Sequence, residues 1–174
     1  TTKVKAASDG FEMEYQTIVK VDLNIKGVSV KAKKTTLAKG EKTDISITYP
    51  AAVKAAGATV TYRATGAVSV SKGKVTAKKA GTGTVIVKVK AGGKTITKKL
   101  NFKVGQITGD SKVKIKKSIT LKVTGISGKV TWSLDKKGKK LASISKKGKL
   151  TAKKKTGKVT VTAKVGKVTM KKTI

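Results

Sequence analysis

The residue types that carry most enzymatic chemistry are missing from this sequence. Its 174 residues include no Cys and no His. Cys supplies nucleophilic thiolates, and His supplies the usual general base and the commonest metal ligand. The sequence therefore predicts no catalytic residues, no metal site and no bound cofactor, and we expect a protein that is not an enzyme.

Two remaining motifs are poor candidates for chemistry. The run Gly93-Lys94-Thr95 resembles the end of a phosphate-binding P-loop, but Lys88 stands where the motif needs its first glycine, and no helical pattern follows. Glu41 and Asp44 are three positions apart on a segment that leads into a strand. An extended chain places such residues on opposite faces, so they form a poor general acid and base pair.

The N-terminal residues hold a third group of candidates. Asp9, Glu12 and Glu14 are three of only eight acidic residues. They lack the spacing of a calcium-binding loop, and the strongly basic remainder of the chain repels divalent cations. We interpret residues 1–16 as a solvated leader, either flexible or packed on the domain that follows.

Positive charge dominates the chain. Lys and Arg number 42, and the formal net charge is +34, with Arg63 as the single Arg. In the run from Val85 to Lys90, alternation predicts aliphatic side chains on the inner face of a strand and Lys88 and Lys90 on the outer face. The first interpretation is that these lysines maintain solubility and keep strand edges from pairing with other chains.

The alternative is that the lysines attach the protein to a polyanion. Teichoic acids, acidic glycans and lipid phosphates are anionic polymers or surfaces, and a densely cationic protein gains from counterion release on binding them. The contact residues predicted for this role are Lys88, Lys90, Lys153, Lys154 and Lys155. Binding of such a polymer that persists at physiological salt would favour attachment, whereas binding that is lost at moderate salt would favour the first interpretation.

Specific nucleic-acid binding is not expected. Base readout favours the bidentate guanidinium of Arg, and Arg63 stands alone. Single-strand binding uses aromatic stacking platforms, yet the chain has only six aromatic residues, and Tyr62, Trp132 and Phe102 are predicted in the core. Any protein this basic binds DNA without specificity at low salt.

The elements that must position these residues are predicted to be strands. Val, Ile and Thr make up 58 of the 174 residues, and β-branched side chains pack well on pleated surfaces. Apolar residues alternate with polar ones in short segments separated by Gly or Lys-Gly turns. The segments predicted as strands before residue 105 centre on residues 18–23, 28–30, 45–47, 60–62, 68–70, 75–77, 85–89 and 96–104. Lysine interrupts every aliphatic stretch, so no transmembrane segment is predicted.

The second half of the chain repeats the first. The segment Ser71–Lys79 returns as Ser145–Lys154, so that Gly73 corresponds to Gly148. Upstream of each glycine, the aromatic residues Tyr62 and Trp132 match, and we predict them as core anchors. The interruption of the alternation at residues 105–110 marks the boundary between the two units.

The fold class predicted is all-β, with two tandem immunoglobulin-like β-sandwich domains. The predicted division is a leader at residues 1–16, domain 1 at residues 17–104, a short linker at residues 105–110 and domain 2 at residues 111–174. A linker this short predicts a rod-like pair with restricted relative motion.

The repeat unit resembles the bacterial Ig-like domain of group 2, which occurs in tandem on bacterial and phage surface proteins. The resemblance covers residues 21–174 and is carried in domain 1 by the segments 37–45, 60–62 and above all Gly73–Val87. In domain 2 it is carried by the segments 130–133, 141–144 and 148–153. Departures from the family pattern are Lys116-Lys117 in place of Gly-Glu, Lys155–Gly157 in place of an Ala-Gly turn, and Tyr62 in place of Trp.

This resemblance implies an extracellular, secreted or cell-surface protein that is not catalytic and acts as a stalk, spacer or adhesion module. Partners consistent with it are an anionic envelope polymer, a host surface glycan or protein, and neighbouring domains of a longer chain. Fold resemblance does not identify the ligand.

Overall fold

The computed structural model describes residues 2–8, 11–17 and 23–174, and side chains from residue 23 onward. The strand expected at residues 18–23 therefore lies almost entirely outside the described residues. Within the leader, β1 (Thr2–Ser8) and β2 (Phe11–Thr17) pair antiparallel. The helical elements of the described chain are short: η1 (Ile25–Gly27), α1 (Ala51–Ala55) and α2 (Lys136–Leu141).

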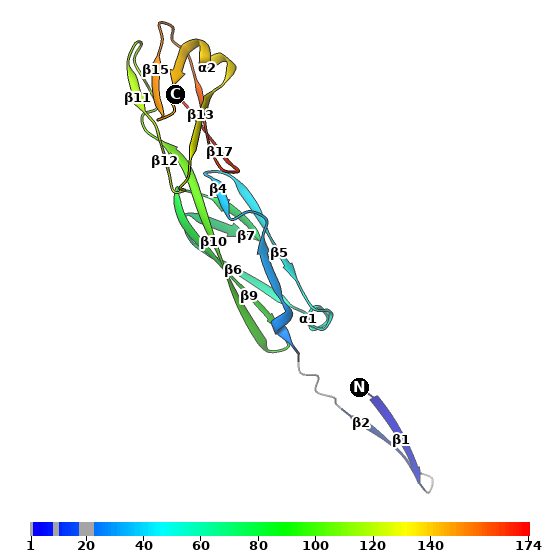
Figure 1. The fold of residues 1–174 in the computed structure, drawn as a ribbon. Helices are drawn as coiled ribbons and strands as arrows, with labels where there is room; N and C mark the ends of the chain where they lie inside the picture. Colours follow the sequence, from blue (N-terminus) through cyan, green and yellow to red (C-terminus); the bar gives the residue numbers. More distant parts are fainter. Residues whose placement is uncertain (1, 9–10, 18–22) are drawn as a thin grey trace.

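Domain 1 is a sandwich of two sheets (Figure 1). The first sheet has the order β3-β5-β8-β7, and the second has the order β6-β9-β10, with β4 parallel to β10. This order matches the A-B-E-D and C-F-G sheets of an immunoglobulin domain. The strands are β3 (Ser29–Ala32), β4 (Thr36–Ala38), β5 (Lys42–Thr48), β6 (Thr59–Gly66), β7 (Val68–Ser71), β8 (Lys74–Ala77), β9 (Gly81–Ala91) and β10 (Lys94–Thr108).

Domain 2 repeats this arrangement with shorter strands. One sheet has the order β11-β15-β14 and the other β13-β16-β17. Only Leu121 separates β11 from β12, so these two strands together replace β5 of domain 1. The strands are β11 (Ser118–Thr120), β12 (Lys122–Thr124), β13 (Val130–Leu134), β14 (Ala142–Ile144), β15 (Lys149–Ala152), β16 (Thr160–Val165) and β17 (Val168–Thr173). The protein is thus all-β, with two tandem immunoglobulin-like sandwiches.

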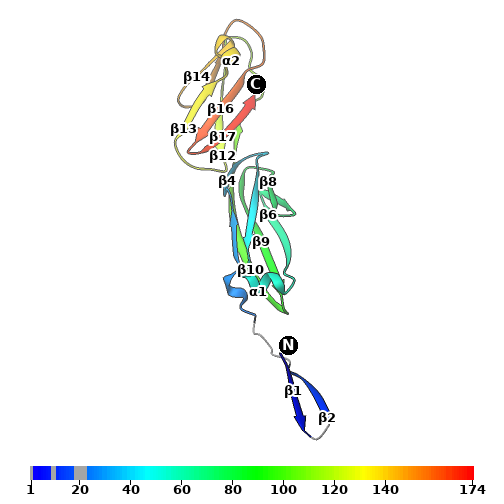
Figure 2. The same cartoon turned by 90° about the vertical axis from the view of Figure 1, so that its right-hand side faces the viewer.

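One strand belongs to both domains. Residues 94–104 of β10 pair with β9, and residues 106–108 pair with β12 of domain 2. The end of β10 thus pairs with β12 in domain 2 as β3 pairs with β5 in domain 1. Strand β10 is therefore the last strand of domain 1 and the first strand of domain 2, and at about 3.3 Å per residue it spans about 50 Å. It passes from one sandwich into the other, and the two sandwiches lie end to end (Figures 1 and 2).

Residues 105–108, where the sequence suggests a linker, lie within this strand. Gly105 is buried, and a Cβ built on it would lie 2.6 Å from Ile126 Cδ1 and 2.8 Å from Met170 Sδ. The glycine therefore allows domain 2 to pack closely against the strand, and it does not end the pairing.

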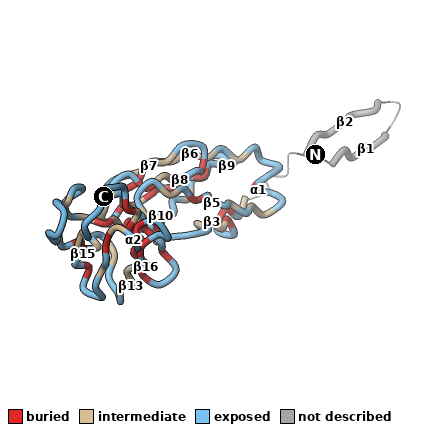
Figure 3. The backbone as a smooth tube through the Cα atoms, turned by 90° about the horizontal axis from the view of Figure 1, so that it is seen from above, coloured by how far each residue is buried: buried red, intermediate tan, exposed pale blue. Residues whose placement is uncertain are grey.

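Each domain has its own aliphatic core. Figure 3 shows where buried residues lie along the backbone. The core of domain 1 ends at Val104, and that of domain 2 begins at Ile107. Alternation places Val85, Val87 and Val89 of β9 at 0% exposure. The largest fully buried side chains of the described residues are Phe102, Leu37, Leu121 and Leu150.

Candidate functional site

The strand pleat places the lysines on the outside of both sandwiches. In β9, Lys88 and Lys90 are exposed between the buried valines. Every described lysine is exposed except Lys172, which is half-buried. Acidic residues are few, and ion pairs join Lys34 to Glu41 and Lys74 to Asp44. Most of the positive charge is therefore available to solvent.

The five lysines predicted for polyanion contact do not form one site. Lys88 and Lys90 lie on the outer face of the β6-β9-β10 sheet of domain 1. Lys153, Lys154 and Lys155 follow β15 in domain 2. The Nζ of Lys153 donates a hydrogen bond of 2.7 Å to the carbonyl of Lys139 in α2, so this ammonium group has a structural contact. A contact role for these lysines stays a prediction.

The two aromatic residues predicted as anchors are half-buried. Tyr62 packs against the core of domain 1 and Trp132 against that of domain 2. A Cβ on Gly73 would lie 3.2 Å from the Tyr62 hydroxyl, and one on Gly148 would lie 3.0 Å from the Trp132 ring. Each ring therefore covers the glycine of a tight turn, and the arrangement is the same in both domains.

The motifs weighed for chemistry have other roles. Gly92 and Gly93 make a two-residue turn between β9 and β10, so Lys94 begins a strand where a P-loop needs a helix. Asp44 is paired with Lys74 at 2.9 Å, and Glu41 with Lys34 at 2.6 Å. In the part of the chain whose side chains are described, no group of three or more acidic residues gathers as a metal site. The predictions for Asp9, Glu12 and Glu14 concern side chains outside that part.

A cleft between the domains was not foreseen from the sequence. It has a volume of about 760 Å³ and is lined by residues 32–36 and Glu41 of domain 1 and by residues 126–129 and 165–168 of domain 2. The apolar residues that line it include Ile126, Val165 and Val168, and four lysines also line it: Lys33, Lys34, Lys129 and Lys167. We call this the interdomain cleft.

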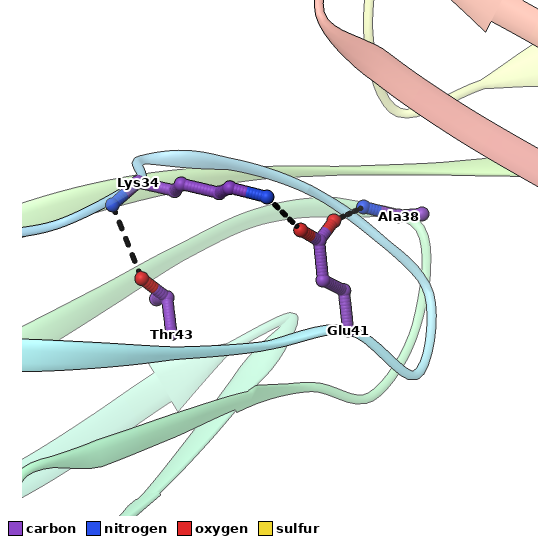
Figure 4. A network of polar contacts seen from close by, with 4 residues as sticks. All are labelled: Lys34, Ala38, Glu41 and Thr43. Atoms are coloured by element: carbon purple, nitrogen blue, oxygen red, sulfur yellow. Dashed lines mark hydrogen bonds and ion pairs between the residues drawn. The ribbon is translucent and has the colours of Figure 1, made fainter.

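The electrostatics of the interdomain cleft are set by one acidic residue among these lysines. The Glu41 carboxylate accepts hydrogen bonds from Lys34 Nζ at 2.6 Å and from the Ala38 N–H at 3.0 Å (Figure 4). Burial by itself would raise the pKa of Glu41, but these hydrogen bonds and the Lys34 charge together hold the pKa below its ordinary value. Glu41 is therefore ionised at neutral pH and pairs with Lys34, while Lys33, Lys129 and Lys167 have no acidic partner among the described side chains.

No residue pattern could have predicted this cleft. Lys33 and Lys129 are 96 positions apart, and lysines occur throughout the sequence. Their common location depends on the packing of domain 2 against β10.

The helices of the described residues are all too short to span a membrane.

Comparison with known proteins gives similarity only to solved structures. No protein-family model and no curated protein matches the chain. The chain is similar to a C-terminal 282-residue fragment of intimin, solved with the intimin-binding domain of the translocated intimin receptor, at 22% identity and a TM-score of 0.48. That match covers 84% of this chain and 62% of the other.

Two further bacterial proteins match at lower sequence identity. Invasin, a bacterial integrin-binding protein, has 14% identity and a TM-score of 0.48, with 84% of this chain and 38% of the other covered. FdeC, an Escherichia coli adhesin, has 17% identity and a TM-score of 0.32, with 90% and 66% covered. The chain spans less than two thirds of the intimin fragment and of invasin. At these values the comparisons assign neither a family nor a function, and the group 2 assignment stays a prediction.

Proposed function

We propose that this chain is a non-catalytic spacer module of an extracellular bacterial surface protein, with an adhesive role for its lysine-rich exterior. The observation that carries the proposal is the shared strand β10, because it pairs with β9 of domain 1 up to Val104 and with β12 of domain 2 from Gln106. Two sandwiches joined in this way resist bending, as a spacer requires.

Contacts at the junction support the same proposal. The Lys39 N–H donates to the Gly105 carbonyl at 2.8 Å, and Ala38 of domain 1 packs against the core of domain 2. Gly125 of domain 2 lies against backbone atoms of Val104 and Gly81. Hydrogen bonds and close packing thus act on more than one side of the strand.

Double spin labelling tests the spacer role. The chain has no Cys, so cysteines introduced at the exposed residues Thr61 and Thr131 are the only labelling sites, one in each domain. We expect a single narrow distance distribution from electron paramagnetic resonance. A labelled pair within domain 1, at Thr61 and Lys42, gives the width that label motion alone produces. A distribution across the junction much broader than this control would contradict the proposal.

A second candidate function, attachment to an anionic envelope polymer or acidic glycan, is favoured by the interdomain cleft. Its three uncompensated lysines and its hydroxyl-bearing and apolar lining suit a chain of charged sugars. The test is binding to purified wall polymer or acidic glycan across a salt series. The variant with Lys33, Lys129 and Lys167 changed to Gln is compared with one in which Lys88, Lys90 and Lys154 are changed to Gln, because both have the same net charge.

Attachment at the cleft predicts that the first variant binds about threefold to 150-fold more weakly than the parent, since an exposed ion pair contributes about 0.2–1 kcal/mol and three are removed. Equal losses in the two variants would assign the binding to net charge, and so would complete release of the polymer at moderate salt.

A further inference from the structure

Domain 1 shows how a strand fills the space beside β4. Leu37 of β4 and Val104 of β10 are paired and fully buried. The Lys103 N–H donates to the Thr35 carbonyl at 2.9 Å, and the Lys39 N–H donates to the Gly105 carbonyl at 2.8 Å. Residues 103–105 therefore hold this place through one buried side chain and a parallel backbone ladder.

Hydrogen bonds identify the equivalent segment of domain 2. The Gly40 N–H donates to the Ala77 carbonyl, and the Lys116 N–H donates to the Ala152 carbonyl, at 2.8 and 3.1 Å. Both residues have a positive φ, +86° and +59°. The register continues on both sides of this pair, so residues 111–115 of domain 2 correspond to residues 35–39 of domain 1.

The end of β17 in domain 2 corresponds to residue 102 of β10 in domain 1. In domain 1, Gly83 pairs with Phe102. In domain 2, Val159 and Ile174 exchange two backbone hydrogen bonds of 3.0 and 2.9 Å, so Ile174 takes the position of Phe102. No described residue of domain 2 takes the positions of residues 103–105.

A hollow of about 500 Å³ lies at this position, and we call it the distal hollow. Its apolar lining includes Val113, Ile115, Leu150, Val159 and Ile174. Ile115 is 43% exposed and is the one exposed large hydrophobic residue among the described side chains. The two hydrogen bonds that Thr35 and Lys39 make in domain 1 have no counterpart at Ser111 and Ile115 in the described structure.

The charge around the distal hollow indicates what its occupant carries. In domain 1, Lys103 lies between Thr36 and Thr82 on neighbouring strands. The corresponding residues of domain 2 are Lys112 and Lys158, and both are exposed on the hollow. Directly opposed charges of one sign are unfavourable across strands, whereas an acidic residue between two lysines is favourable.

We propose that the distal hollow accepts one extended polypeptide strand from a further Ig-like module, with the pattern acidic residue, β-branched residue, glycine. The strand runs parallel to residues 111–115 and continues the line of β17. Its β-branched side chain enters the hollow as Val104 does in domain 1, and its acidic side chain lies between Lys112 and Lys158. This is strand addition at an open sheet edge. The inference concerns docking and does not rest on the proposed function.

The test adds four residues after Ile174 of the whole chain, which presents the strand at high effective concentration. Three extensions are compared: Glu-Val-Gly-Gln, Lys-Val-Gly-Gln and Glu-Asp-Gly-Gln. We expect the first to raise the melting temperature of domain 2 by several degrees and to slow hydrogen exchange of the Ile115 amide at least tenfold. The second should stabilise less at low salt and equally at 1 M salt, and the third should not stabilise.

Two results would overturn the proposal. One is an Ile115 amide that exchanges at the same rate with Glu-Val-Gly-Gln as with Glu-Asp-Gly-Gln, together with equal melting temperatures. The other comes from sedimentation equilibrium of the unextended chain: a dimer that the Glu-Val-Gly-Gln extension abolishes would assign the distal hollow to a second copy. The spin-label experiment on the domain junction reads neither quantity, so the two proposals fail independently.

Discussion

Gly125 of domain 2 packs so closely on domain 1 that a single added methyl group would collide with it. Its φ is +84°, and a Cβ built on it would overlap the Val104 carbonyl oxygen and lie 2.5 Å from the Gly81 nitrogen. Both neighbours are backbone atoms of paired strands in domain 1, so neither can move aside by changing a rotamer. In Gly125→Ala, domain 2 must therefore shift away from β10.

The expected cost has two parts. A left-handed conformation costs a residue with a Cβ about 1–2 kcal/mol. Overpacking typically adds about 1–3 kcal/mol. We therefore expect Gly125→Ala to lower the free energy of unfolding by about 2–5 kcal/mol, measured by urea denaturation followed by circular dichroism. The distance distribution between labels at Thr61 and Thr131 should also broaden or move.

Gly166→Ala is the matched control. Gly166 has a φ of +55°, and nothing lies within 4 Å of a Cβ built on it. This variant carries conformational strain alone, so it should lose about 1–2 kcal/mol and leave the distance distribution unchanged. If Gly125→Ala cost no more than Gly166→Ala and gave the parent distribution, the close approach at the junction would not hold the domains together.

Two further predictions concern single sites. Gly148→Ala should destabilise the protein by about 1 kcal/mol more than Gly73→Ala. The Cβ at residue 148 would overlap the Leu121 carbonyl oxygen and press on the Trp132 ring, whereas the Cβ at residue 73 would lie 3.2 Å from the Tyr62 hydroxyl. Comparable losses of the two variants in urea denaturation would refute this. The lowered pKa of Glu41 stabilises the folded state above the ordinary carboxyl pKa, and that contribution is lost as the pH falls through the folded value. The parent should therefore lose up to about 1 kcal/mol relative to Glu41→Gln between pH 6 and pH 3, and parallel pH profiles would contradict the assignment.

Local patterns in the sequence were enough to predict the fold class. Strict alternation in the segments around Val85 and Val60 indicates strands with one buried face, because successive side chains of a strand point to opposite sides. The correspondence of Gly73 with Gly148 identified two similar units, and each glycine lies in a tight turn beneath an aromatic ring. Turn chemistry and alternation are local, so they can be read without knowing the partner strands.

Which distant residues lie close together was decided only by the tertiary structure. Gly105 interrupts the alternation in the sequence, yet in the structure it lets Ile126 and Met170 approach a continuous strand. Lys33 and Lys129 share the interdomain cleft because domain 2 packs against β10, and a lysine-rich sequence cannot show which lysines meet. The distal hollow likewise becomes visible only when the filled position of Val104 is compared with its counterpart beyond Ile174. Contacts between distant residues depend on sheet register and domain packing, which local alternation does not encode.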